Sequence, residues 1–188
     1  MSEVLRDPAL EAAIARALPH GDDPRTDTQG VLAFPAPDGR HLVVLYDAWE
    51  FHMGATTEKV ALVDRDARVL RLFPFECVST GVQVCTWRRD GALFALALGP
   101  CVFVWSFRDQ RFALAGIAFS ASSIAFGHGT LQVLESTYRV GKDGGYYADG
   151  PAGARFTLAN LAWHEAGELE RYAELAKAAP KHAASNPP

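Results

Sequence analysis

Residues 84–98, VCTWRRDGALFALAL, hold the pattern that decides the fold of this chain. An apolar run ending in Trp87 is followed by the turn pair Asp90-Gly91 and then by a second apolar run. Glycine in such a turn supplies the positive φ that a tight connection needs, and aromatic and β-branched neighbours favour strands. The stretch therefore predicts a β-hairpin.

The same pattern occurs in residues 31–46 (VLAFPAPDGRHLVVLY) and 124–134 (IAFGHGTLQVL). The anchoring aromatics Phe34, Trp87 and Phe126 are 53 and 39 residues apart, close to the ~40–50 residues of a four-stranded propeller blade. Further strands are expected at 59–63, 68–73, 101–107 and 111–114. We predict an all-β fold of three antiparallel β-meanders, either an open propeller-like arc or a sandwich, with short terminal α-helices.

Two of these segments resemble WD40-type β-propeller repeats. Trp87-Arg-Arg-Asp-Gly91 and Phe103-Val-Trp105 stand at positions similar to the turn and the Trp-ending strand of that family, over about residues 30–137, although Ser106 replaces the Asp of the Trp-Asp pair. Three copies fall short of the ~4–8 blades of a closed ring. Either the sheets stay open, or a second chain completes the ring as a homodimer. A plain meander with glycine turns explains the recurrence equally well.

The chain is expected to form a single domain, residues 1–188. Its expected segments are a helix at 7–18, a polar linker at 19–28, a β core at 31–165, a helix at 167–179 and a flexible tail at 180–188. Asp7 is a suitable N-cap, Pro8 fits the first helical position, and Pro180 ends the second helix.

Alternation along the strands predicts which side chains point inward. The expected inward residues are Leu32, Phe34, Val43, Leu45, Leu62, Leu70, Leu72, Val84, Leu93, Ala95, Val102, Val104, Ile124, Phe126, Leu131 and Val133.

Composition excludes several classes of function. The net charge of −4 and the lack of a Lys/Arg cluster argue against nucleic-acid binding, which needs a basic surface. We find no apolar stretch of membrane-spanning length and no leader pattern, which predicts a cytoplasmic protein without a membrane partner. Cys77, Cys85 and Cys101 lie in apolar strands at irregular spacing, so we expect buried free thiols rather than a metal site.

A search for catalytic motifs is negative. The chain has no phosphate-binding loop, no HExxH pair and no nucleophile elbow, so we expect no cofactor, no metal and no enzymatic activity. Glu50 and His52 alternate along one segment and could form an acid/base pair, but such a pair without a third group is more often a surface hydrogen bond.

Two long interruptions of the repeat are the candidate binding loops. Residues 47–57 carry Trp49, Glu50 and His52, while residues 138–153 are glycine-rich. The candidate protein-binding residues are Trp49, Glu50, His52, Asp143, Tyr146, Tyr147 and Asp149, because loops on a rigid sheet concentrate binding residues and Trp and Tyr supply hot spots. These aromatics could instead form small satellite cores under the loops.

Two hypotheses about function follow. In the first, the chain is a non-enzymatic protein-binding module, specifically an immunity-type inhibitor of a bacterial toxin with a basic domain, by analogy of composition. In the second, it is a small enzyme or small-molecule-binding protein that uses Glu50, His52, Tyr146 and Tyr147 around a pocket.

Overall fold

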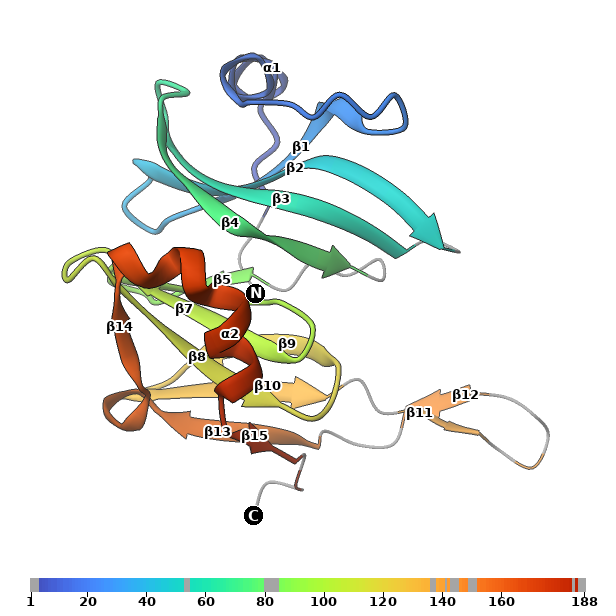
Figure 1. The fold of residues 1–188 in the computed structure, drawn as a ribbon, viewed down its shortest axis with the longest axis vertical. Coiled ribbons are helices and arrows are strands. Elements are labelled where there is room, and N and C mark those ends of the chain that lie inside the picture. The colour runs from blue at the N-terminus through green and yellow to red at the C-terminus, as the bar shows by residue number, and fades with distance from the viewer. Residues whose placement is uncertain are drawn as a thin grey trace.

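The computed structural model describes residues 4–52, 55–79, 85–135, 138–140, 142, 146–148, 152–183 and 185. Its main feature is a stack of three antiparallel sheets, here called sheets A, B and C, with α1 on the far side of sheet A (Figure 1). The all-β fold with few helices that the hairpin pattern predicts is confirmed. The resemblance to WD40-type repeats is neither confirmed nor refuted.

Sheet A is a four-stranded meander in chain order. Its strands are β1 (Asp27–Pro35), β2 (His41–His52), β3 (Ala55–Asp64) and β4 (Val69–Ser79). Gly39 has a φ of 68° in the β1–β2 turn, and Gly91 and Gly129 have values of 71° and 68° in the turns of the two later copies. Each repeat therefore contains the hairpin and the left-handed glycine that its sequence predicts.

Sheet B is the central layer and has partners from far along the chain. Its meander consists of β5 (Cys85–Trp87), β6 (Leu93–Ala97), β7 (Cys101–Ser106) and β8 (Arg111–Ile117). Strand β14 (Trp163–Glu165) pairs antiparallel with β8, and β15 (Lys181–His182) pairs with β8 in parallel. At least this part of the expected flexible tail therefore has an ordered pairing.

Sheet C has the strand order β13-β10-β9. These strands are β9 (Ala121–Phe126), β10 (Thr130–Glu135) and β13 (Gly153–Thr157). Between β10 and β13 the chain forms a separate two-stranded hairpin of β11 (Tyr138–Val140) and β12 (Tyr146–Ala148).

The helices lie at the ends of the chain, as expected. Helix α1 (Pro8–Ala17) begins where Asp7 accepts hydrogen bonds from the backbone N–H groups of Ala9 and Leu10, at 3.2 and 3.1 Å. Near the C-terminus, η1 (Leu158–Asn160) precedes β14, and η2 (Ala166–Arg171) runs into α2 (Tyr172–Ala178). The helix expected at 167–179 is therefore a 3₁₀ turn in its first part. Among the described residues, no helix is both long and apolar enough to cross a membrane.

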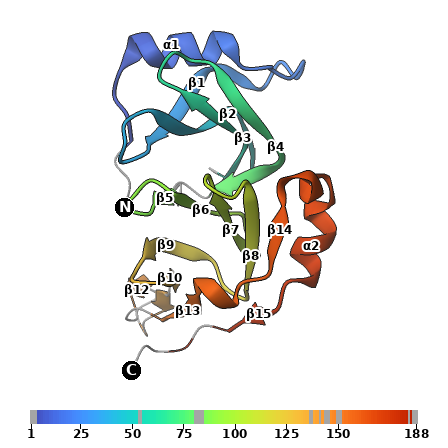
Figure 2. The ribbon, with the colours of Figure 1, turned by 90° about the vertical axis from the view of Figure 1, so that its left-hand side faces the viewer.

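Figure 2 shows α1 and the three sheets stacked one on another. Three apolar layers of side chains hold this stack together. Between sheets A and B lie aromatic side chains that include Phe94, Phe103 and Trp105, all fully buried. Valine, alanine and leucine side chains fill the space between sheets B and C, and Ile14 of α1 packs on the outer face of sheet A. Sheet B is therefore buried on both faces, and each large apolar side chain so buried contributes roughly 1.5–3 kcal/mol.

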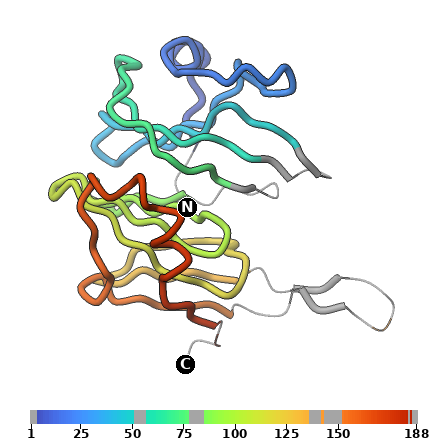
Figure 3. The backbone as a smooth tube through the Cα atoms, viewed as in Figure 1, coloured from blue at the N-terminus to red at the C-terminus, as the bar shows by residue number. Residues whose placement is uncertain are grey.

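A helix covers one end of the stack, and the outer face of sheet C forms the other end. Helix α1 covers β1 to β3 on the outer face of sheet A (Figure 3). On sheet C, Ser123, Gln132 and Arg155 alternate with the buried Ile124, Leu131 and Phe156, so the outer face carries polar side chains. Because a further blade would need an apolar face there, this pattern favours an open stack over a ring continued by a second chain.

Most of the inward residues expected from alternation are buried, including Phe34, Val43, Leu45 and Val133. Leu32 and Phe126 are partly buried, and Val84 lies outside the described residues. Leu70 and Leu72 are the errors, because their exposed fractions are 48% and 46%. On β4 the inward side chains are instead Phe73, Phe75 and Cys77, because the β3–β4 register shifts twice along the strand.

Candidate functional site

The first candidate loop is an extension of two strands of sheet A. Strands β2 and β3 continue through most of residues 47–57, with Trp49 opposite Thr57 and Glu50 opposite Thr56. Trp49 is half-buried and Glu50 is exposed, while the backbone of His52 pairs with Ala55 at the end of the hairpin. The prediction of a loop here is wrong, because the hairpin simply lengthens sheet A.

The second segment also contains a hairpin. Tyr146 and Tyr147 lie on β12, opposite Val140 and Arg139 of β11. Asp143 and Asp149 lie outside the described residues. The β2–β3 hairpin belongs to sheet A and the β11–β12 hairpin is inserted in sheet C, so the two predicted halves of the site belong to opposite outer layers, with sheet B between them (Figure 1).

At the base of the β2–β3 hairpin lies a polar centre that the sequence did not single out. Asp47 follows the apolar run of β2 at a register shift between Tyr46 and Trp49, and its φ is +54°. Such a left-handed conformation is uncommon for residues other than glycine, and Asp is among those that tolerate it. Only 1% of its side chain is exposed, so this bulge places a carboxylate under the N-terminal segment.

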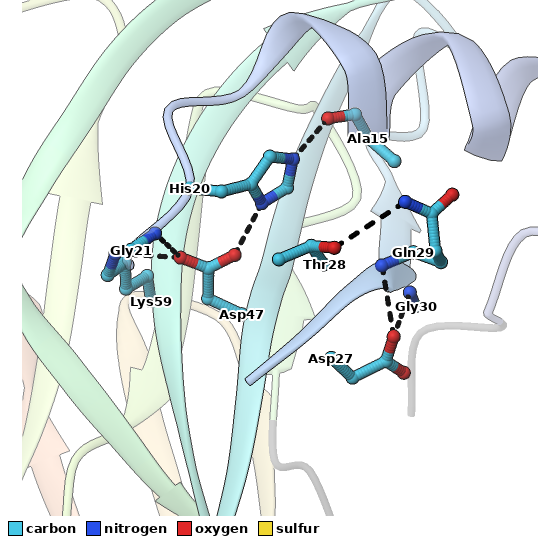
Figure 4. A network of polar contacts seen from close by, with 9 residues as sticks. All are labelled: Ala15, His20, Gly21, Asp27, Thr28, Gln29, Gly30, Asp47 and Lys59. Carbon is cyan, nitrogen blue, oxygen red and sulfur yellow. Dashed lines mark hydrogen bonds and ion pairs between the residues drawn. The ribbon is translucent and has the colours of Figure 1, made fainter. Parts of the chain in front are cut away.

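Three groups bind the Asp47 carboxylate (Figure 4). Its Oδ1 lies 2.5 Å from Nδ1 of His20, and its Oδ2 accepts hydrogen bonds from Lys59 Nζ at 2.7 Å and from the Gly21 N–H at 2.9 Å. Burial alone would raise the pKa of Asp47, but these hydrogen bonds outweigh that effect and lower it. The carboxylate is therefore held ionised.

His20 is held at both ring nitrogens. Its Nε2 lies 2.6 Å from the backbone oxygen of Ala15 in the last turn of α1. A carbonyl and an ionised carboxylate can only accept, so both ring nitrogens must donate and the ring is an imidazolium. The hydrogen bond to Asp47 raises the pKa of His20, against the opposing effect of burial.

The polar side chains of this centre bind one another and attach the N-terminal segment to sheet A. Neither nitrogen of His20 is available to take a proton from a substrate, and Lys59 is engaged with the same carboxylate. The centre joins the 19–28 segment and the end of α1 to sheet A, and the same segment places Arg25 over the Trp49 ring at 4.9 Å. The segment expected to be a linker is therefore attached to β2 of sheet A through His20 and Arg25.

The cysteines behave as the sequence predicts. Cys77, Cys85 and Cys101 are free and buried, and burial raises the pKa of Cys77 to about 12. Within the described part of the chain, no group of three or more His, Cys, Asp or Glu side chains is arranged to hold a metal ion.

The exposed apolar surface lies elsewhere on sheet A. Strand β4 is the edge strand next to β3, and it exposes Leu70, Leu72 and Pro74, here called the β4 edge patch. Leu70 and Leu72 are the large apolar side chains found exposed in the described part of the chain. The buried residues under α1 come from β1 to β3, and of β4 only Val69 at its start packs against that cluster.

Comparison with known proteins adds no homology argument, since no family model, curated protein or solved structure matches the chain.

Proposed function

We propose that this chain is a non-enzymatic protein-binding module that acts in the cytoplasm and that contacts its partner with the β4 edge patch. The supporting observation is the exposure of Leu70 and Leu72, nearly half of each side chain, next to a fully packed core. Apolar side chains left open on a sheet edge are typical of protein contact surfaces.

The polar groups support a binding role over catalysis. His20, Asp47 and Lys59, which would be the natural choice for acid/base chemistry, satisfy one another. The three thiols are buried, and burial raises their pKa values, so they are poor nucleophiles.

The partner we propose is a basic protein, because the chain carries a net charge of −4 and Glu76 is exposed at the end of the patch. An immunity-type inhibitor of a bacterial toxin is the specific form of this proposal. The second contact would be the β11–β12 hairpin with Tyr146 and Tyr147.

The experiment compares three forms of the full chain as bait in lysate of the source organism. They are the natural sequence, the double variant Leu70→Thr with Leu72→Thr, and the control Arg108→Ser in the β7–β8 turn. We expect a basic protein that is enriched by the natural chain and by the control but not by the double variant. The enriched protein is then purified, and its Kd for each form is measured.

A loss of about tenfold to a hundredfold in affinity is expected for the double variant if these side chains are central to the contact. Equal enrichment by all three forms would place the contact elsewhere. If no protein is enriched by any form, the binding proposal is rejected.

A further inference from the structure

A groove with a volume of about 440 Å³ lies beside β4, where the apolar layer between sheets A and B reaches the surface. It is lined by residues of β4, of the β6–β7 turn, of α2 and of the start of β15. Among the described strands β4 pairs only with β3, so its other edge is open at this groove.

The floor of the groove is apolar. Phe75 and Leu98 are buried members of the layer between sheets A and B. Tyr172 and Ala176 of α2 pack against the same layer. The Phe75 and Tyr172 ring centroids are 4.7 Å apart, and the Tyr172 hydroxyl lies 3.3 Å from Cys101 Sγ. Two neighbouring rings of this kind offer a surface for a flat aromatic group.

Two lysines stand on the rim of the groove. Lys177 lies one helical turn after Ala173, so both side chains are on the side of α2 that lines the groove. Lys181 pairs with Gly116 of β8, which in turn stands opposite Cys101 of β7. Neighbouring residues of a ladder point to the same face, and Cys101 lies in the layer between sheets A and B. The Lys181 side chain therefore faces that layer.

The second of these lysines is held in place by the C-terminal segment. Residues 180–183 and 185, here called the C-terminal strap, pair with β8 through β15, and the last of them exchanges two backbone hydrogen bonds with Gly153, at 3.0 and 3.1 Å. At Gly116 a Cβ atom would lie 2.5 Å from the backbone oxygen of Pro180, so only glycine allows the strap to approach β8 this closely. The backbone of β8 therefore fixes one side of the groove.

The charges that face the groove are positive. Within the described part of the chain, no ion pair involves Lys177 or Lys181. Glu76 is the acidic residue of the lining, but it alternates with the inward Cys77 and stands opposite Lys59, so its carboxylate points to the outer face of sheet A. Both ammonium groups can therefore bind an anion.

We propose that this groove binds a small organic anion, a carboxylate or phosphate group carried on a flat aromatic body. The aromatic body packs on the rings of Phe75 and Tyr172. The oxyanion is bound by the ammonium groups of Lys177 and Lys181. An apolar groove of this size with a few polar groups at its rim is typical of small-molecule sites. The proposal does not rest on the protein-binding role, because the two leucines of the β4 edge patch do not line the groove.

NMR titration of the ¹⁵N-labelled full chain tests this binding. 2-Naphthoate and 2-naphthyl phosphate carry the two oxyanions, 2-naphthamide is the neutral counterpart, and acetate and inorganic phosphate lack the aromatic body. We expect saturable shifts at the amides of Leu98, Ala173 and Ala176 for at least one aryl anion, with a Kd of about 1 mM, as for other ligands of this size. The aryl anion that binds more tightly identifies the oxyanion of the natural ligand.

Two matched pairs of variants separate the charge from the apolar floor. Lys177→Gln with Lys181→Gln should weaken binding of the aryl anion about tenfold, whereas Lys142→Gln, an exposed lysine between β11 and β12, should not change it. Ala173→Leu places a larger side chain in the groove and should weaken binding by about tenfold or more. Ala178→Leu makes the same change at an exposed position of α2 outside the lining and should leave binding unchanged.

Heteronuclear spectra of all four variants check that the fold is retained. The proposal is overturned if neither aryl anion saturates by about 10 mM, or if naphthamide binds as tightly as naphthoate. It is also overturned if the double lysine variant or Ala173→Leu binds like the natural chain, or if Ala178→Leu weakens binding as much as Ala173→Leu does. Binding of acetate or inorganic phosphate as tight as that of its aryl counterpart would overturn it as well, because the apolar floor would then contribute nothing.

Discussion

His20 Nδ1 lies 2.5 Å from Asp47 Oδ1, a contact that fastens an N-terminal segment to the middle of β2 across 27 residues of sequence. The Asp47 side chain is almost fully buried, and about a quarter of the His20 side chain is exposed. A charged pair at this depth contributes only while both partners are ionised, so the contact should make the stability of the protein depend on pH.

The direction of that dependence follows from the raised pKa of His20. The stabilisation is fully present below the unfolded value of 6.5 and is lost as the pH rises through the folded pKa. We expect the free energy of unfolding to fall over that window by at most about 1.4 kcal/mol per pH unit. In His20→Gln this decrease in the free energy of unfolding with rising pH should be missing. Urea unfolding at pH values from about 5.5 to 9 measures it.

The control for this titration is His128→Gln, in the β9–β10 turn, which should keep the pH profile of the natural chain. If His20→Gln and the natural chain show parallel profiles, the imidazolium assignment is wrong.

Removing the carboxylate should cost more than removing the imidazole. Asp47→Ala leaves the ammonium of Lys59 and the ring of His20 without their shared acceptor. Because 37% of the Lys59 side chain and 26% of the His20 side chain are exposed and can be solvated, we expect a loss of about 1–3 kcal/mol, below the ~3–5 kcal/mol of a fully buried pair. Asp47→Asn keeps an acceptor and should cost less. Chemical denaturation measures both, and Asp66→Ala, an exposed carboxylate in the β3–β4 turn, should change stability by no more than ~0.5 kcal/mol. If Asp47→Ala and Asp66→Ala lowered the free energy of unfolding equally, the assignment of Asp47 as a buried charge would be contradicted.

Gly116→Ala should release the C-terminal strap. The added methyl group would meet backbone oxygens of Pro180 and Ala179, which cannot move without breaking the pairing of β15. We expect faster tryptic cleavage after Lys181 and loss of hydrogen-exchange protection at the Ala118 amide. Gly167→Ala is the matched control, because a Cβ there meets nothing within 4 Å. Unchanged cleavage in Gly116→Ala would show that the strap does not depend on this close approach.

The thiols should be unreactive in the native protein. Burial raises the pKa values of Cys77, Cys85 and Cys101, and only the thiolate reacts with a disulfide reagent. Titration with an aromatic disulfide at about pH 8 should be slow under native conditions and should count three thiols in denaturant. Rapid native reaction of even one thiol would mean that the packing between sheets A and B opens readily.

The hairpins could be predicted because their signals are local. Gly39, Gly91 and Gly129 each adopt the positive φ that the turn pattern requires, and the strands on either side form where apolar runs occur. The pairing of β14 and β15 with β8 could not be predicted, because it joins residues about 50 and 65 positions apart with no shared pattern.

The polar centre was missed for a similar reason. His20 lies in a stretch rich in Pro, Gly and Asp that has every mark of a linker, and its partner is distant in sequence. The one signal was Asp47 itself, a charged residue directly after the apolar run of β2. A carboxylate in that position must be paired if it is buried, and this requirement points to a partner without naming it.

The β4 strand tests the face assignment most directly. Alternation predicted Leu70 and Leu72 inside, but the structure exposes them and buries Phe73 and Phe75. The double change Leu70→Thr with Leu72→Thr should therefore lower the free energy of unfolding by only about 1–2 kcal/mol, because about half of each leucine is already exposed and threonine suits a strand. Phe73→Ala should cost ~3–5 kcal/mol, since its ring packs against Phe94, Phe103 and Trp105. Thermal and urea unfolding of both variants distinguish the faces. A large loss in the leucine double variant with a small one in Phe73→Ala would restore the original alternation and remove the β4 edge patch as a binding surface.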